Sequence, residues 1–517
     1  MSSGLSTAAA LFLYVGKFWS RYALFFYNVR WHPLMTHCGT NRRRNYIDIL
    51  DDDSLLNIFY HCRPLFLLEE GFGDIHILWG TTWGCERWWY KLAWVCRRWR
   101  RIILASPSYL GISLVWMCGA TIPDMLAHSP PFPLIIDYIP MFETNTPKVE
   151  ERLILALKHR DRISRIRIWV DVPPWERLTE AIGEEFPLLE YLYLRPWARG
   201  NTNLSLPSTL RAPRLRHLVL VDFAFPVGSP LLAGLVTLTI ESVNPSANFG
   251  PNELLQQLSL MPHLETFRIS FDQVLFNEDV KRQLLQASSS APVTLPTLRW
   301  FGFGRPSAYI GAVLLRIATP LLRNTEIMYM TENPLDLTSS VLLTLQVMYR
   351  TENPEICNVK VMFYDVHVAV VMYPHQRTGM STLRFRSSEF SIDSDRMLDF
   401  TVQIFDRIRT VLTEVETLTL EDKASWAPHK RFAIQTGWCE LLRSFNQVRT
   451  LHVSGGDLIK GLSHSLQPHD GESAIELLPI LNVLSCPKPE GTHVSESCRS
   501  FLAARQDAGF PVTILHP

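Results

Sequence analysis

A recurring strand motif, P-x-L-x-x-L-x-L, limits the folds open to this 517-residue chain more than any other feature. Its first copy spans residues 187–194, and further copies start at Pro213, Pro262 and Pro296, with a degraded copy at Pro320. Segments that begin at 163, 189, 215, 235, 264 and 298 keep the apolar spacing and lie 20 to 34 residues apart. Leucine-rich repeats have a period of ~20–29 residues, with one strand and one helix in each. The motif therefore predicts an irregular repeat of this kind.

The segments between the strands also favour a solenoid. Residues 252–261, 278–287 and 308–318 have apolar side chains at helical spacing, and each follows a loop rich in proline, asparagine or serine. A strand followed by a helix that returns to a parallel neighbour is the basic step of a solenoid. We therefore expect an α/β fold, in which a small helical N-terminal domain precedes a leucine-rich-repeat-like solenoid with a parallel strand ladder and outer helices. Residues 328–386, with two copies of Met-Tyr-x-Thr-Glu-Asn-Pro, fit this pattern least.

The charge balance narrows the classes of partner. The chain has 50 basic and 50 acidic residues, while 47% of its residues are hydrophobic and 19% are charged. Disordered chains are poor in apolar residues, so disorder throughout the chain is excluded. A nucleic-acid-binding chain usually carries a basic excess, and we expect no nucleic-acid partner. The nine cysteines include no C-x-x-C pair, so we expect free thiols in a reducing compartment.

Residues 1–45 form a leader that we expect to be poorly ordered or a short helix. Its apolar run, 8–15, is followed by Lys17 and Arg21, and it is shorter than the ~18 residues that a membrane span needs. A secretory signal has its basic residues before the apolar run, not after it. An amphipathic helix packed on the body and a true targeting role are the other interpretations. We expect no membrane association.

Residues 46–110 predict a small helical domain. Its first helix begins with an acidic run at 51–53, where the helix dipole favours negative charge, and continues into an apolar cluster between 55 and 59. A second helix is predicted over 92–102, with Leu92, Val95, Cys96 and Trp99 on one face. Six of the 15 tryptophans lie between residues 79 and 99, which indicates a core or a docking surface.

These two helical segments resemble an F-box. That pattern has a leucine-proline opening, an acidic pair, a leucine-rich helix ending in isoleucine-phenylalanine, and a second helix with valine-cysteine, two basic residues and tryptophan. Residues 50–59 and 95–99 match the two halves, but Asp51 replaces the usual proline and an insertion at about 63–89 separates them. The interrupted, tryptophan-rich F-box is similar to that of a large family of mushroom-forming fungi. The likeness covers most of the chain from residue 47.

The resemblance implies a non-enzymatic substrate adaptor of an SCF-type ubiquitin ligase, in the cytoplasm or nucleus. Its F-box would bind the Skp adaptor and through it a cullin, segment 111–134 would be a connection, and residues 135–517 would bind an unknown protein substrate. The residues that match Skp-facing positions are Leu50, Leu55, Leu56, Ile58, Phe59, Val95, Cys96 and Trp99. The alternative is a repeat-based interaction scaffold whose F-box is degenerate and never joins a ligase.

Alternation along the strands predicts where a substrate would bind. The leucines of the motif face the core, so the positions between them line the other, concave face. Arginine, tyrosine and tryptophan are enriched at binding hot spots. We expect these side chains to be exposed and to bind substrate: Arg165, Arg167, Trp169, Tyr191, Tyr193, Arg195, His217, Arg268 and Trp300. The same positions are held by Thr237, Thr239, Glu241 and Thr266. The four arginines favour an acidic or phosphorylated partner, and a solvated face with scattered aromatics is the alternative interpretation.

Motifs for catalysis are missing from the sequence. It contains no P-loop, G-x-G-x-x-G, G-x-S-x-G or H-E-x-x-H. His464, His469 and Asp470 lie in a polar segment, where a solvated surface is more usual than a metal site. Cys96, on an apolar helix face, is predicted to be an inert packing residue. We expect no cofactor, no metal and no enzymatic activity, and the alternative is an active site assembled from scattered residues.

Overall fold

The structure is a computed structural model, and it describes most of the chain in separate stretches. These are residues 50–62, 88–117, 132–138, 147–170, 175–196, 204–224, 226–243, 250–271, 292–304, 307–330, 341, 344–345, 355–364, 367–374, 379–386, 394–423, 435–455, 458–459, 462, 476–487 and 492–516. The leader, nearly all of the 63–89 insertion, the predicted 278–287 helix and His464, His469 and Asp470 lie outside them. The chain divides into two compact units, Met1–Ile58 and Phe59–Pro517.

The described part of the first unit holds the start of helix α2, Asp52–His61, which runs on into the second unit. Oδ1 of Asp51 accepts a hydrogen bond from the backbone N–H of Ser54 at 2.6 Å. Asp52 and Asp53 occupy the first turn, where the backbone N–H groups favour negative charge. The sequence of this segment therefore supplies both a side-chain cap and a favourable first turn for the predicted helix.

The second unit continues with three short helices rather than the single helix predicted over 92–102. They are α4, Trp88–Ala93, α5, Arg97–Ala105, and α6, Pro107–Leu110. The prediction of one continuous apolar face is wrong because the chain turns at 94–96 and Cys96 is extended, with φ −157°. Nε of Arg100 donates to the carbonyl oxygen of Ala93 at 3.1 Å, which satisfies a carbonyl group at the end of α4.

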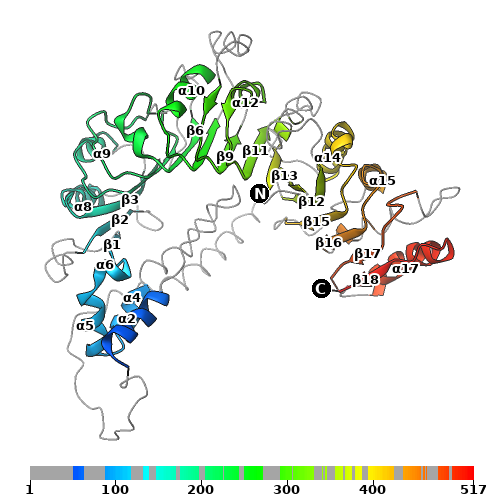
Figure 1. Cartoon of the computed structure of the whole chain (residues 1–517), viewed down its shortest axis with the longest axis horizontal. Coiled ribbons are helices and arrows are strands. Elements are labelled where there is room, and N and C mark those ends of the chain that lie inside the picture. The colour runs from blue at the N-terminus through cyan, green and yellow to red at the C-terminus, as the bar shows by residue number, and fades with distance from the viewer. Residues whose placement is uncertain are drawn as a thin grey trace, which may run out of the picture. The chain divides into compact units, whose positions relative to one another are not determined.

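Beyond these helices, the described second unit contains an open sheet of sixteen strands, with β1 at one edge and β18 at the other (Figure 1). In spatial order its strands are β1 Leu114–Met117, β2 Leu134–Tyr138, β3 Ile163–Val170, β4 Tyr191–Pro196, β5 His217–Val221, β6 Thr237–Val243, β7 Thr266–Phe271, β9 Trp300–Gly304, β11 Asn324–Met330, β14 Ser381–Arg386, β13 His367–Pro374, β12 Ile356–Phe363, β15 Thr417–Asp422, β16 Thr450–Ser454, β17 Val483–Ser485 and β18 Thr513–Leu515. The prediction of a mixed α/β fold with a large, mainly parallel sheet is confirmed. The strand ladder begins at β1, which lies within segment 111–134, the predicted connection.

The proline of the repeated motif has a defined structural role. In each of the four full copies, the N–H two residues after the proline donates to the carbonyl oxygen just before it, as from Leu189 to Phe186 at 3.2 Å and from Leu215 to Ala212 at 3.0 Å. The degraded copy makes the same turn, from Leu322 to Thr319 at 3.3 Å. Proline is favoured at the second position of such a turn because its φ is already set. The motif is therefore a turn that leads into a strand.

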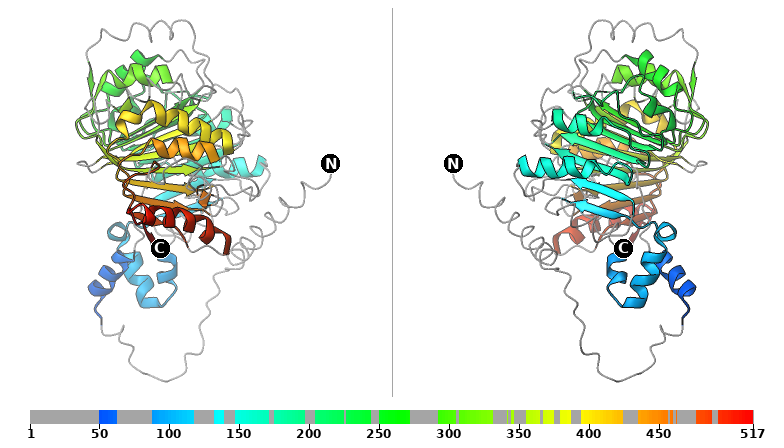
Figure 2. Two further views of the ribbon diagram at one scale, coloured as in Figure 1. Left: turned by 90° about the vertical axis from the view of Figure 1, so that its right-hand side faces the viewer. Right: turned by 90° about the vertical axis from the view of Figure 1, so that its left-hand side faces the viewer.

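Helices cover one face of the sheet (Figures 1 and 2). They are α8 Pro147–Leu157, α9 Trp175–Ile182, α10 Pro251–Ser259, α12 Ser307–Leu314, α14 Ser394–Arg407, α15 Gln435–Arg443 and α17 Thr492–Asp507. The predicted helices at 252–261 and 308–318 correspond to α10 and α12. A second pair of strands, β8 Val293–Thr294 and β10 Ile317–Ala318, is also parallel. The apolar motif residues, such as Leu192 and Leu218, are fully buried.

The 328–386 region contains the one reversal in the described sheet. Strand β13 runs antiparallel to both of its neighbours, β14 and β12, whereas β14 is parallel to β11 and β12 is parallel to β15. The chain therefore passes from β11 to β12, returns through β13 and reaches β14 beside β11. This hairpin path explains why the region does not follow the repeat. Most of the two Met-Tyr-x-Thr-Glu-Asn-Pro segments lies outside the described residues.

Candidate functional site

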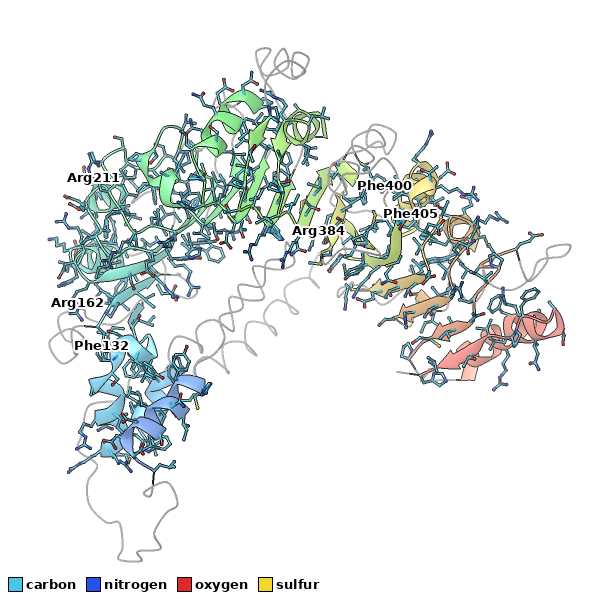
Figure 3. All side chains as sticks on the ribbon, viewed as in Figure 1. Phe132, Arg162, Arg211, Arg384, Phe400 and Phe405 are labelled. Carbon is cyan, nitrogen blue, oxygen red and sulfur yellow. The ribbon has the colours of Figure 1, made fainter. Side chains whose placement is uncertain are left out.

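The first candidate site is the face of the sheet opposite the helices, which we call the helix-free face because none of the described helices covers it. Pairing between strands is in register, so that Arg165, Tyr191, His217 and Thr237 lie level on four neighbouring strands. Arg384, from β14, lies on this side, away from Phe400 and Phe405 of α14 (Figure 3). The nine side chains predicted to bind substrate all occupy alternate strand positions on this face. The structure thus brings them together, as alternation predicts.

The prediction that all of these side chains are exposed is wrong. Tyr193, Arg268 and Trp300 are buried, as are Thr239 and Thr266. Adjacent strands lie about 4.8 Å apart. A side chain is therefore covered by the residues that lie level with it on the two neighbouring strands. The remaining predicted residues are half-buried: Arg165, Arg167, Trp169, Tyr191, Arg195, His217, Thr237 and Glu241.

Three ion pairs and one group of three charged side chains occupy this face. Of their acidic members, the sequence analysis selected only Glu241. Arg167 binds both carboxylate oxygens of Asp137, with Nε to Oδ1 at 2.7 Å. Nη2 of Arg268 lies 3.3 Å from Oε1 of Glu241. Two further groups lie beyond β9: Arg384 Nε to Glu326 Oε1 at 2.6 Å, and Lys360 and Lys423 at 2.8 and 3.0 Å from Glu421. Their strand positions could have identified the other three, because Asp137, Glu326 and Glu421 hold the same alternate positions as the arginines.

An aromatic and basic cluster covers β3 to β5, which we define as Arg165, Trp169, Tyr191, Arg195 and His217. The guanidinium carbon of Arg195 lies 4.4 Å from the centre of the Trp169 ring, a cation–π contact. The rings of Tyr191 and His217 are 6.4 Å apart. Burial lowers the pKa of His217, and the positive charge of Arg165 lowers it further. His217 therefore takes up a proton less readily than an exposed histidine.

The second candidate site comprises the residues that match the F-box. In the first unit, Leu55 is buried, Leu50 and Leu56 are half-buried, and Ile58 is 45% exposed. In the second unit, Phe59 is fully buried and its ring packs 4.8 Å from that of the half-buried Trp99. Phe59 and Leu55 therefore have a structural role, whereas Ile58 is available to a partner.

Val95 and Cys96 differ from their predicted state. The predicted packing of Cys96 on an apolar helix face is wrong, because Cys96 is exposed and caps α5, its Sγ accepting from the N–H of Trp99 at 3.5 Å. Val95 is 59% exposed in the turn before it. The same unit also exposes Tyr60, Trp94 and Tyr109, which sequence reasoning did not select.

Comparisons with known proteins leave the family open. No protein-family model matches the sequence, and the search of curated proteins also gives no match. Within the described residues, no group of three or more histidine, cysteine or acidic side chains is placed to hold a metal ion. None of the described helices has the length and apolar character that crossing a membrane requires.

Proposed function

We propose that this protein is a substrate-recognition adaptor of an SCF-type ubiquitin ligase. In this function the F-box-like segment binds the Skp adaptor, and through it a cullin, while the strand ladder holds a protein substrate. The adaptor would act in the cytoplasm or nucleus and would itself catalyse no reaction. The support comes from the F-box-like sequence, from the exposed apolar residues within it and from the long sheet face that follows.

The observation that carries this proposal is the exposure of Val95 beside a packed helix pair. Val95 lies in the turn before α5, and Trp99 of that helix packs on Phe59 of α2. Val95 is an apolar side chain that is 59% exposed, and binding to a partner would bury it. Ile58 meets the same criterion in its own unit. Each residue also stands at a position that matches the F-box pattern.

The departures from the F-box pattern bear on the alternative, a scaffold with a degenerate F-box. Asp51, in place of the usual proline, caps α2 through its hydrogen bond to Ser54 and does not disrupt the helix. The substitution therefore leaves helix α2 intact. The insertion lies almost entirely outside the described residues, so Skp binding itself must decide between the two functions.

The test is direct binding of the purified full chain to Skp. An Ile58→Asp/Val95→Asp variant changes two exposed side chains and leaves Leu55 and Phe59 in place. We expect it to lose about tenfold or more in Skp affinity, the effect of placing charges in an apolar contact. The matched control is Leu260→Asp/Leu315→Asp, which alters two equally exposed leucines near the α10 and α12 helix ends.

Wild-type binding with selective loss in the first variant would support the adaptor function, and substrate ubiquitination by the reconstituted ligase would extend it. Two results would contradict it. One is the absence of Skp binding by the wild-type chain, which would leave the scaffold as the function. The other is equal binding by both variants, which would place any Skp contact elsewhere.

A further inference from the structure

Strand β18, at the end of the described ladder, pairs with β17 on one side only (Figure 1). On that side the N–H of Thr513 donates to the carbonyl oxygen of Asn482 at 2.8 Å, and the N–H of Cys486 donates to that of Leu515 at 3.1 Å. Backbone groups along a strand alternate in direction, so the N–H and C=O of Ile514 point to the opposite side. Within the described residues, no strand pairs with that side, which we call the β18 edge. Such an edge is a template for another extended segment.

The side chains of β18 also leave apolar surface uncovered. Ile514 is level with Leu484 of β17 on the face that the helices cover, but Ile514 is only half-buried whereas Leu484 is buried. Leu515, on the helix-free face, is 50% exposed, and Phe510, just before the strand, is 46% exposed. A further strand beside β18 would cover part of Ile514 and Leu515. The β18 edge therefore offers apolar contact as well as backbone hydrogen bonds.

The β18 edge has few of the features that usually protect exposed strands. Natural proteins block free edges with charged side chains, most often lysine, or with prolines and bulges. Residues 510–516, F-P-V-T-I-L-H, include no lysine, arginine, aspartate or glutamate. The pairing of β18 with β17 also shows no shift of register. Pro511 precedes the strand, so the usable edge is about 512–516.

Two contacts hold β18 in its extended form. Before the strand, the N–H of Phe510 donates to the carbonyl oxygen of Arg505, in α17, at 2.8 Å. After it, Nδ1 of His516 lies 3.0 Å from the carbonyl oxygen of Cys486. A template that is formed in advance loses less conformational entropy on binding than a mobile segment does.

We propose that the β18 edge binds a short, uncharged, extended segment of a partner protein, which adds to the sheet as a further strand. Hydrogen bonds with the backbone of Ile514 supply affinity in this mode of binding, and side chains at alternate positions of the segment contact Ile514 and Leu515. β-Branched and aromatic residues suit those positions because they pack well on a sheet. The inference does not rest on the proposed function, since it requires no F-box.

The size of the β18 edge favours a short segment over a second folded copy of the chain. A stable interface between folded proteins takes about 20–30 residues from each side. The edge at 512–516 and the adjoining Phe510 supply far fewer. Its lack of charge indicates the character of the segment as well. A charged side chain placed against it would lose hydration and find no ion to pair with.

The test is selection of phage-displayed random dodecapeptides on the full-length protein, followed by synthesis of the consensus peptide. We expect valine, isoleucine, threonine and aromatic residues to be enriched at alternate positions. Backbone N-methylation of the synthetic peptide removes its N–H donors. At one set of alternate residues it should weaken binding about tenfold or more, because hydrogen bonds to β18 are lost. At the other set, whose donors face away, it should change binding less than about threefold.

A protein variant locates the site. Ile514→Pro removes the outward N–H but leaves the bonds from β18 to β17, which belong to the residues on either side. It should bind the consensus peptide about tenfold or more weakly than wild type does. The control is Ile514→Val, which keeps the N–H and should bind within about threefold of wild type. The comparison of N-methylated peptides uses the wild-type protein, so it does not depend on the folding of either variant.

Four results would overturn the inference. The first three are a selection that yields no binding peptide, equal effects of N-methylation at the two sets of residues, and unchanged peptide binding by folded Ile514→Pro. The fourth is self-association through the edge. Analytical ultracentrifugation would reveal it as a wild-type dimer at micromolar concentration that Ile514→Pro does not form, and the edge would then belong to a second copy of the chain.

Discussion

The guanidinium of Arg505 donates a hydrogen bond to the carbonyl oxygen of Leu478 at 3.1 Å. Leu478 has a left-handed backbone, with φ 53°, in the turn before β17. Nη2 of the same arginine donates to the carbonyl oxygen of Pro479, also at 3.1 Å. Arg505 is fully buried, so its guanidinium depends on such carbonyl groups for hydrogen-bond partners. The side chain thus joins α17 to an unusual turn and closes the end of the ladder.

Replacement of Arg505 by methionine should loosen the C-terminal end of the sheet. The change keeps much of the buried volume but removes the donors, and hydrogen bonds from a charged group contribute ~1.5–3 kcal/mol each. We expect a loss of about 3 kcal/mol, confined to the end because repeats contact only their neighbours. Hydrogen exchange of β17 and β18 measures it. Arg499→Met, at an exposed position of α17, is the control, and equal protection in the two variants would contradict the prediction.

The strand ladder could be predicted from the sequence because its determinants are local. A proline two residues before a leucine specifies a turn, and the turn fixes which residues of the next strand point inward. Alternation then places Arg165 and Tyr191 on one face whatever the neighbours are. The same reasoning could not indicate the reversal at β13, since an apolar strand reads alike in either direction.

The candidate site could be predicted only in part, because burial on a sheet face depends on distant neighbours. Arg167 and Asp137 pair across 30 residues of sequence, and Arg384 and Glu326 are further apart. No local pattern specifies such partners, so the buried state of Arg268 was missed as well. Cys96 was misassigned for a different reason, since the apolar spacing on both sides of a short turn matches that of one helix.

The buried pair of Glu326 and Arg384 should show strong coupling. The Arg384 Nε lies 2.6 Å from Glu326 Oε1, and both side chains are almost fully buried. Glu326→Gln leaves the arginine without its countercharge, and we expect a loss of about 3–5 kcal/mol in the free energy of unfolding of this region. The double variant Glu326→Met/Arg384→Met should recover most of that loss, because neither charge is then buried.

A double-mutant cycle of wild type, Glu326→Met, Arg384→Met and the double variant, followed by urea unfolding and by hydrogen exchange of β11 and β14, would measure this coupling. Glu416 and Arg449 provide the comparison, because their side chains are 3.9 Å apart and mostly exposed. Glu416→Gln should cost less than about 1 kcal/mol. Independent, additive effects of the two changes at 326 and 384 would show that the pair is not coupled.

His217 should titrate below its ordinary pKa of 6.5, and the charges around it should move that pKa in opposite directions. Burial lowers the pKa first, Arg165 lowers it next and Glu190 raises it. Arg165→Gln should therefore raise the pKa of His217, and Glu190→Gln should lower it. NMR of the imidazole Cε1–H measures both, and a shift of the same sign in the two variants would contradict the assignment.

The same histidine predicts a dependence of stability on pH. The folded pKa lies below the unfolded value, so that the unfolded chain takes up the proton first as the pH falls. The contribution of His217 is complete above about pH 6.5 and declines as the pH falls toward the folded pKa. Wild-type protein should lose more stability than His217→Gln between neutral pH and that point. Parallel urea midpoints for the two proteins would refute this.

Asp51 should stabilise α2 as its cap, which gives a physical reason for the residue that departs from the F-box pattern. Its carboxylate accepts from the Ser54 N–H at 2.6 Å, and removal of such an acceptor costs about 1 kcal/mol. In the full chain, Asp51→Ala should increase hydrogen exchange at the first amides of α2. Asp51→Asn keeps the acceptor and should preserve most of the protection, whereas Asp51→Pro restores the usual F-box residue and loses the cap. Equal exchange in Asp51→Ala and wild type would show that the helix does not depend on this contact.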